Sequence, residues 1–213
     1  MSSDSGTFHL TSGLLTRFQV ELGRDEEFET AVQSALPLVF KQRSTLVWFA
    51  LKFGKSSYGI IDVFPTEQAR AAHLGGSVGH SVLGEVGPLL ATPARVEHFD
   101  VLAHHIAAGA NGKTTTKGVL GTFKAKQWRE AEIDTFLRQQ VGSAAHDGQT
   151  AASFAIAFGE RRYGMFIAFA NDADRSERVQ SAPEQLSIHL PSVDGDAPAV
   201  EMVDITAAKI APA

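Results

Sequence analysis

The sequence of 213 residues contains no cysteine and more acidic than basic residues. Without cysteine the chain cannot form disulfides or thiolate metal sites, and it has no thiol nucleophile. The 24 acidic and 19 basic residues give a formal net charge of −5. This charge gives no electrostatic reason to expect nucleic acid or an anionic membrane as a partner.

The sequence also lacks long apolar segments. No run of about 18 apolar residues occurs, so we expect no segment that spans a bilayer. The first ten residues, MSSDSGTFHL, do not combine a basic start with an apolar core and so do not resemble a secretory signal. With 44% hydrophobic and 20% charged residues, the composition is typical of a soluble globular protein. We therefore expect a cytoplasmic protein.

What the sequence does contain is an internal repeat. Residues 53–59 read FGKSSYG, and residues 158–164 read FGERRYG. When the match is extended to residues 45–70 and 150–175, nine of the 26 aligned positions are identical without a gap. Two copies indicate a fused pair of like domains rather than a solenoid.

The match extends over nearly the whole chain. Downstream, RVEHFDVLAHHI (95–106) matches AVEMVDITAAKI (199–210), with the offset changing from 105 to 104 residues. We therefore divide the chain into repeat 1 (12–106), a linker (107–116) and repeat 2 (117–210). The segment 181–199 has no counterpart of equal length in repeat 1 and is interpreted as a loop-like insert.

Each repeat shows the same order of expected elements. In repeat 1, residues 13–22 alternate as in a strand, and residues 24–40 have acidic residues first and then apolar residues at helical spacing. TLVWFALKF and YGIIDVF form a hairpin around a short turn, with glycines where the backbone turns or another chain approaches closely. A helix through EQARAAHL and a strand at 95–106 complete the order βαββαβ, the ferredoxin-like unit.

A ferredoxin-like unit covers one sheet face with its helices and leaves the other face bare. Two such units in one chain can bury their bare faces against each other. We therefore predict an α+β fold in which tandem ferredoxin-like repeats pack sheet to sheet as a pseudo-dimeric α/β barrel. The sequence leaves open whether the fused chain forms a further homodimer.

A family resemblance follows from these segments. ALPLV, TLVWFALKFG, YGIIDVFP, EQARAAHL and VEHFDVLAHHI, in this order, resemble the antibiotic biosynthesis monooxygenase superfamily of dimeric α/β barrels. Repeat 1 is the closer match and repeat 2 a diverged copy. Some members of the superfamily hydroxylate quinol- or anthrone-like substrates without metal or flavin, others degrade heme, and many have no known reaction. The resemblance thus implies the barrel more firmly than any one activity.

The heme-degrading pattern is absent from this sequence. Those members have an asparagine on the first strand and a tryptophan just before the helix histidine. Here the first strand reads LLTRFQV, and Ala71 and Ala72 precede His73. We expect no heme and no other cofactor.

The resemblance implies a role for His73, because oxygenases of the family often place a histidine there, facing the pocket between helix and sheet. Oxygenation without a cofactor needs a base that makes an electron-rich phenolate or carbanion, and a neutral imidazole suits that work. The alternative is a partly exposed helix histidine. Repeat 2 has Arg178 at the matching position, so the role is not duplicated.

Two residues of the hairpin strands are candidates for substrate binding in the same pocket. Trp48 could stack on a flat aromatic substrate or belong to the core. Asp62 is either a hydrogen-bond partner in the pocket or a solvent-facing acid.

Three further residues are weaker candidates. Tyr58 recurs as Tyr163 in repeat 2, which also suits a structural role. Arg17 could orient a phenolate or carboxylate, although its strand face suggests exposure. His80 lies in the glycine-rich stretch GGSVGHSVLG (75–84), interpreted either as a mobile lid or as a plain loop.

Two apparent motifs predict no site. A histidine-rich cluster near the end of one strand consists of His98, Asp100, His104 and His105. Repeat 2 has Met202, Ala208 and Lys209 where repeat 1 has these histidines, so we expect no metal. AAGANGKT (107–114) fits a loose phosphate-loop pattern, but a strand-like segment follows where a true phosphate loop opens a helix, so it is interpreted as the linker.

Three functions remain compatible with the sequence. The first is a cofactor-independent monooxygenase that acts on a small aromatic or quinol-like substrate with His73 as base. The second is a non-catalytic α/β-barrel protein that binds a small apolar or aromatic molecule. The third is an assembly domain with a filled interior. An open pocket containing His73 would separate the first two from the third.

Overall fold

The computed structural model describes residues 9–187 and 190–211, without the side chains of 77–78, 80–81, 182–187, 190 and 196–197. The strands and helices are β1 (Ser12–Gln19), α1 (Asp25–Lys41), β2 (Val47–Gly54), β3 (Ser57–Phe64), α2 (Glu67–Leu74), α3 (Ser77–Val86), β4 (Arg95–Ile106), β5 (Lys117–Ala125), α4 (Glu130–Ala144), β6 (Thr150–Gly159), β7 (Arg162–Phe169), α5 (Asp172–Ser187) and β8 (Val193–Ile210). Short 3₁₀ turns lie at Gly87–Leu89 and Leu190–Ser192.

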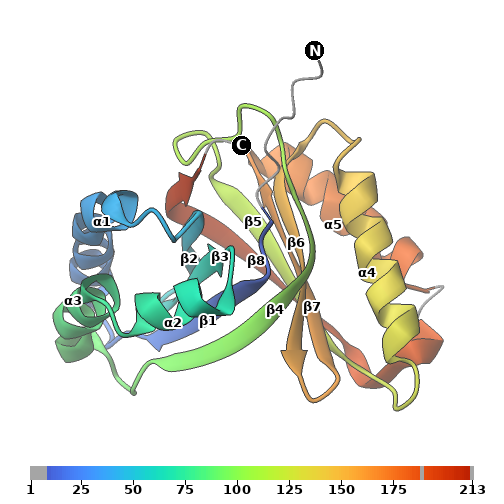
Figure 1. Ribbon diagram of the computed structural model, residues 1–213, viewed down its shortest axis with the longest axis horizontal. Coiled ribbons are helices and arrows are strands. Elements are labelled where there is room, and N and C mark those ends of the chain that lie inside the picture. The colour runs from blue at the N-terminus through green and yellow to red at the C-terminus, as the bar shows by residue number, and fades with distance from the viewer. Residues whose placement is uncertain (1–8, 188–189, 212–213) are drawn as a thin grey trace.

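All strands belong to one closed antiparallel barrel in the order β1-β3-β2-β8-β5-β7-β6-β4. The fourth strand of each repeat joins the two repeats: β4 pairs with β1 and with β6, and β8 pairs with β5 and with β2. Helices α1, α2 and α3 lie on one side of the barrel and α4 and α5 on the other (Figure 1). The pseudo-dimeric α/β barrel expected from the sequence is confirmed.

The interior of the barrel is a packed apolar core. Inward-facing side chains of both repeats meet there, and the rings of Phe49 and Phe166 lie 5.3 Å apart between centroids. Side chains alternate between the two faces along each strand. Those of Trp48 and Ile60 point outward to the helices. The pocket expected between helix and sheet therefore lies outside the barrel.

The repeated glycine of the YG frame is explained by a close approach. A Cβ atom on Gly59 would lie 2.9 Å from the ring of Phe53 and 3.0 Å from the backbone oxygen of Thr16. A Cβ atom on Gly164 would meet Phe158 and the backbone oxygen of Gly121 in the same way. The frame is thus kept because a phenylalanine ring and the first strand both pass over the glycine.

Two expectations about loops were wrong. The stretch 75–84 is mostly helix α3, whose Val82 and Val86 are buried against α1 at helical spacing. This apolar face outweighs the low helix propensity of the glycines. In the insert 181–199, α5 continues to Ser187 and β8 begins at Val193, where it pairs with Ala125; residues 188–189 lie outside the described part.

The phosphate-like motif precedes β5, a strand, as expected for a linker. Asn111 forms its turn, with its side-chain oxygen accepting the backbone N–H groups of Lys113 and Thr114. None of the helices in the described ranges is both long and apolar enough to cross a membrane.

Candidate functional site

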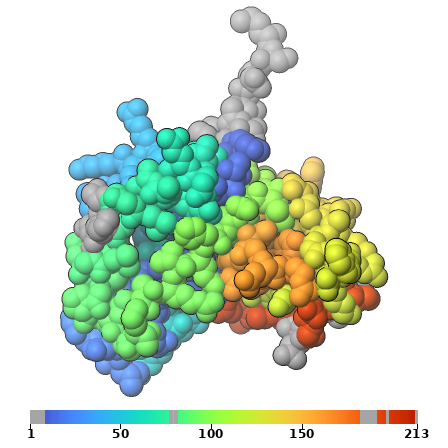
Figure 2. Space-filling model, turned by 60° about the horizontal axis from the view of Figure 1, so that its bottom comes forward, coloured from blue at the N-terminus to red at the C-terminus, as the bar shows by residue number. Residues whose placement is uncertain are grey.

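A pocket lies between the outer face of the repeat 1 sheet and helices α2 and α3. It encloses about 480 Å³ of empty space including its mouth, and Leu83 and Val96 are exposed side chains on its wall. Its lining consists of Leu14, Thr16, Phe18, Trp48, Ile60, Asp62, His73, Leu74, Gly79, Val82, Leu83 and Val96. The space-filling view shows a small opening between the teal α2 segment and the green segments that follow it (Figure 2).

Hydrogen bonds cap the start of helix α2 and tie its Arg70 to the sheet. Thr66 caps the helix by accepting the backbone N–H of Ala69 at 3.1 Å. The buried guanidinium of Arg70 donates to the backbone oxygens of Phe99 at 2.8 Å and Gly13 at 3.2 Å. These bonds fix where the helix carries His73.

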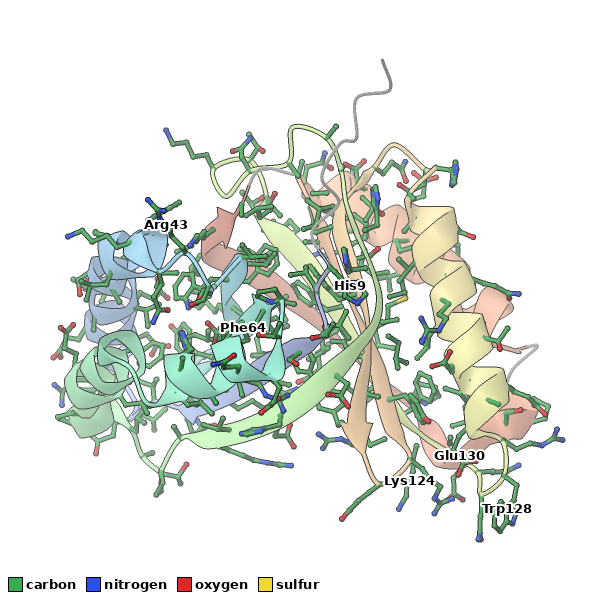
Figure 3. The ribbon with its side chains drawn as sticks, viewed as in Figure 1. His9, Arg43, Phe64, Lys124, Trp128 and Glu130 are labelled. Carbon is green, nitrogen blue, oxygen red and sulfur yellow. The ribbon has the colours of Figure 1, made fainter. Side chains whose placement is uncertain are left out.

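His73 is buried, so it is not the partly exposed helix histidine of the alternative interpretation. Its ring packs 5.1 Å from that of Phe64, which is labelled in Figure 3 beside α2. Its Nδ1 lies 2.8 Å from Oε1 of Gln42, which also accepts the hydroxyl of Thr45 at 2.8 Å. Because Oε1 is an acceptor, Nδ1 carries the proton and the lone pair is on Nε2. Burial lowers the pKa of His73 to about 4, so the ring is neutral at pH 7.

Asp62 faces the bare nitrogen of His73. It lies on β3 between Leu14 of β1 and Trp48 of β2, its register partners, and it is only 3% exposed. Burial raises the pKa of Asp62 to about 8, so its carboxyl is mostly protonated at pH 7. Its Oδ1 lies 3.5 Å from Nε2 of His73 and has no hydrogen-bond partner within the described residues.

A separation of 3.5 Å is too long for a good hydrogen bond between carboxyl and imidazole. In its apolar surroundings, the pocket therefore holds the lone pair on Nε2 of His73 next to the carboxyl of Asp62, with no hydrogen bond between the two groups. A ligand hydroxyl placed against both could donate to Nε2 of His73 and accept from the carboxyl of Asp62. Such an arrangement can take a proton and stabilise the oxyanion that remains.

Trp48 belongs to the core and also lines the pocket. It is 1% exposed and belongs to the outer core cluster, and it also lines the pocket next to Asp62. Its side chain can therefore form a flat wall for an aromatic ring without being exposed itself.

Tyr58 and Arg17 lie outside the pocket lining. The hydroxyl of Tyr58 lies 2.9 Å from Oδ1 of Asp25 and 2.7 Å from Oε1 of Glu29. Burial and these two carboxylates raise the pKa of Tyr58 far above its usual value. Arg17 forms a bidentate ion pair with Glu201 of β8. Both side chains tie elements together at other places in the barrel.

Among the histidine candidates with described side chains, His98 and His104 do not join the site. His80 lies in α3, and its side chain is outside the described part of the chain. His98 is exposed on β4, and Nε2 of His104 accepts the backbone N–H of Leu10 at 3.3 Å. Within residues 9–187 and 190–211, no group of three or more metal-ligating side chains is close enough to hold a metal ion.

Gln42 and Thr45 orient His73, but neither stood out in the sequence. A signal was present in the repeat, because Asp147 and Thr150 stand at the matching positions of repeat 2. There the hydroxyl of Thr150 donates to Asp147 at 2.8 Å, as the hydroxyl of Thr45 donates to Gln42. The copied polar pair next to position 73 could have indicated a supporting role.

No protein-family model and no curated protein matches the sequence. Solved structures do match. A candidate monooxygenase from Fusobacterium nucleatum superposes with a TM-score of 0.80 at 11% identity, over 96% of this chain and 96% of that chain. Another from Lactobacillus acidophilus gives 0.79 at 12% identity, over 95% and 97% of the chains.

A third solved structure, described as an anthrone oxidase-like protein, gives a TM-score of 0.60 at 10% identity over 93% of this chain and 92% of that chain. Identities of this size carry the fold and not the reaction. The matches span nearly the whole length of each chain, as the closed barrel of two repeats does. The chain therefore has the closed two-repeat α/β-barrel fold of these structures, as its sequence indicated.

Proposed function

We propose that the protein is a cofactor-independent monooxygenase that acts on a small aromatic or quinol-like substrate in the repeat 1 pocket. The observation that carries this proposal is the neutral, buried imidazole of His73 beside the unpartnered carboxyl of Asp62. A protein that only packs its core leaves few buried polar atoms without partners. The two groups have the protonation states that removal of a proton from a hydroxyl requires.

The reaction begins with a proton transfer. The substrate O–H bond breaks, the proton moves to Nε2 of His73, and the electron pair stays on the substrate as an enolate or phenolate. The protonated carboxyl of Asp62 donates a hydrogen bond to this oxyanion. The hydrogen bond from Nδ1 to Gln42 holds the ring in the tautomer that can accept the proton.

Dioxygen is the oxidant. An anthrone-type substrate, R₂CH₂, enters this step as its enol tautomer, whose hydroxyl gives its proton to His73. The resulting enolate transfers an electron to O₂, a C–O bond forms at the former CH₂ carbon, and His73 returns its proton to give a hydroperoxide. Loss of the second hydrogen from the same carbon as a proton then breaks the O–O bond. The products are a carbonyl group and one water, so that R₂CH₂ and O₂ become R₂C=O and H₂O.

The shape of the pocket limits the substrate. The pocket is narrow, so an aromatic ring must displace side chains to enter. Leu83, on the wall and 42% exposed, is free to move toward solvent. Apart from Thr16, Asp62 and His73, the lining is apolar, which favours a mainly apolar aromatic ring system.

The names of the structures that share the fold agree with the proposed reaction class and say nothing of the substrate. Two structures that share the fold bear the name of monooxygenases and a third that of an anthrone oxidase-like protein. The alternative function, a non-catalytic small-molecule-binding protein, uses the same pocket.

Oxygen uptake tests the proposal. The purified, metal-stripped protein is assayed with a panel of hydroquinones and anthrones, beside His73→Ala, Asp62→Asn and the control His98→Ala, which removes an exposed histidine of β4. We expect substrate-dependent uptake in the wild type and the control. Each of the other two variants should lose at least about 100-fold, the size of a general-base contribution.

Circular dichroism and urea unfolding establish that each variant is folded. Uptake by folded His73→Ala at the wild-type rate would contradict the mechanism. No uptake with any substrate, together with saturable binding of the same compounds, would establish the non-catalytic alternative instead.

A further inference from the structure

Repeat 2 has its own pocket at the position equivalent to that of repeat 1. It encloses about 670 Å³ of empty space including its mouth, against about 480 Å³ in repeat 1. Its lining consists of Val119, Gly121, Phe123, Phe136, Leu137, Gln140, Met165, Ile167, Arg178, Val179, Pro198 and Val200. When the two repeats are aligned, Val119, Phe123 and Met165 occupy the positions of Leu14, Phe18 and Ile60. The two pockets are therefore copies of one another.

The chemistry of the two pockets differs at two positions. Ile167 stands where repeat 1 has Asp62, and Arg178 stands where repeat 1 has His73. A guanidinium group has no lone pair with which to accept a proton, and isoleucine cannot donate one. The repeat 2 pocket thus has neither the base nor the acid of the repeat 1 pocket, and it cannot perform the same proton transfer.

Arg178 supplies the positive charge of this apolar pocket. Its side chain is 15% exposed and lies 4.0 Å from Oδ2 of Asp147, an ion pair without a hydrogen bond. Asp147 instead accepts the backbone N–H groups of Gln149 and Thr150, each at 2.9 Å, and the hydroxyl of Thr150 at 2.8 Å. Asp147 thus accepts three hydrogen bonds from its own turn, and none from the guanidinium of Arg178 is found among the described residues.

We propose that the repeat 2 pocket binds a small apolar carboxylate, with its hydrocarbon part against the apolar lining and its carboxylate paired with Arg178. Arginine presents two parallel N–H donors that match a carboxylate, and such a pair is strong where water is partly excluded. This site binds without chemistry, so it does not rest on the function proposed for repeat 1.

Gly121 shows that the pocket has room at its floor. Repeat 1 has Thr16 at this position, but a Cβ atom on Gly121 would meet nothing closer than the backbone oxygen of Met165 at 3.9 Å. A larger side chain at position 121 would therefore enter the pocket without a clash with the backbone. Gly121→Leu is accordingly a variant that fills the pocket and leaves Arg178 unchanged.

Calorimetric titration of the full chain tests the proposal with two compounds of the same shape, 2-naphthoate and 2-naphthamide. We expect one molecule of naphthoate to bind at least tenfold more tightly than the uncharged amide, and added salt to weaken only naphthoate. Arg178→Met should weaken naphthoate at least tenfold and change the amide little. Arg178→Lys should restore part of the loss, since it keeps the charge without the two-pronged geometry.

Two more variants locate the site. Gly121→Leu should weaken both compounds, and Lys124→Met, which removes an exposed cation of repeat 2 away from the pocket, should weaken neither. Unfolding midpoints confirm that the variants are folded. The proposal is overturned if wild-type protein binds no naphthoate at millimolar concentration, if it binds acid and amide alike, or if binding survives both Arg178→Met and Gly121→Leu.

Discussion

The Nζ atom of Lys209 lies 2.7 Å from the backbone oxygen of Gln42. Lys209 belongs to β8 of repeat 2, whereas Gln42 is the C-cap residue of α1 in repeat 1. The same amine donates to the backbone oxygen of Val39 at 2.9 Å. A cation at the last turn of a helix satisfies its free carbonyl groups and its dipole. Repeat 2 thereby holds in place the residue whose side chain orients His73.

Lys209→Met should destabilise the protein, because it removes the charged donor to the backbone oxygens of Val39 and Gln42 at the end of α1. We expect a loss of about 1–3 kcal/mol in the free energy of unfolding, as for a buried group that loses a charged partner. If repeat 1 is catalytic, oxygen uptake should fall as well, since Gln42 would be held less firmly.

Lys117→Met is the matched control for Lys209→Met. Lys117 pairs with Asp204 at 2.8 Å on the surface, and exposed ion pairs contribute about 0–1 kcal/mol. Urea unfolding of the two variants measures the difference. Equal losses would contradict the view that Lys209 caps α1.

The stability of the protein should fall as the pH rises above about 6.5. The pKa of Asp62 is raised to about 8 in the folded state, so the folded protein binds more protons than the unfolded chain between about pH 4 and 8, which lowers stability as pH rises. The pKa of His73 is lowered to about 4, which has the opposite effect up to about pH 6.5. The two effects oppose each other below pH 6.5, and above it only that of Asp62 remains.

The free energy of unfolding should fall by about 1–2 kcal/mol between pH 6.5 and 8, because the folded state binds up to one proton more than the unfolded chain over this range. Urea unfolding at intervals of half a pH unit measures it. In Asp62→Asn the decline above pH 6.5 should vanish and the rise between pH 4 and 6.5, due to His73, should appear. A variant that declines above pH 6.5 as the wild type does would show that another group is responsible.

The hydroxyl of Tyr58 should stabilise the fold, because it links β3 to two carboxylates of α1. We expect Tyr58→Phe to lower the free energy of unfolding by about 1–2 kcal/mol. Tyr163, its copy in repeat 2, has no side-chain hydrogen bond within the described part of the chain, so Tyr163→Phe should change stability by less than about 0.5 kcal/mol. Thermal unfolding of the pair measures the difference, and a larger effect of Tyr163→Phe would reverse this assignment.

Gly59 should not tolerate a methyl group. Gly59→Ala places a Cβ atom 2.9 Å from the Phe53 ring and 3.0 Å from the Thr16 backbone oxygen, and this overpacking should cost about 1–3 kcal/mol. Gly54→Ala, in the same hairpin, meets nothing within 4 Å and should be within about 0.5 kcal/mol of the wild type. Denaturant midpoints compare the two, and similar values would mean that the first strand and Phe53 move aside easily.

Much of the fold followed from local pattern. Alternation along the strands and helical spacing in residues 24–40 depend only on neighbours in sequence, and the internal match fixed their order twice over. Helix α3 was missed because its glycines obscured an apolar face that is decided by contact with α1. The start of β8 was missed because it depends on pairing with β5, far away in the sequence.

The candidate site divides in the same way. Trp48 and Asp62 were candidates as residues of the hairpin strands, and the resemblance added His73. The sequence contained no sign that Lys209 would reach Gln42 across the seam between repeats, or that Tyr58 would be held by α1 instead of lining the pocket.

The amino-acid sequence by itself determined the duplication, the strands and most of the helices, because periodicity is a property of adjacent residues. Only the tertiary structure decided that β4 and β8 close one barrel across both repeats, because strand edges choose partners that are distant in sequence. It also decided that Asp62 is protonated and His73 neutral, because desolvation depends on everything packed around a group rather than on the group itself.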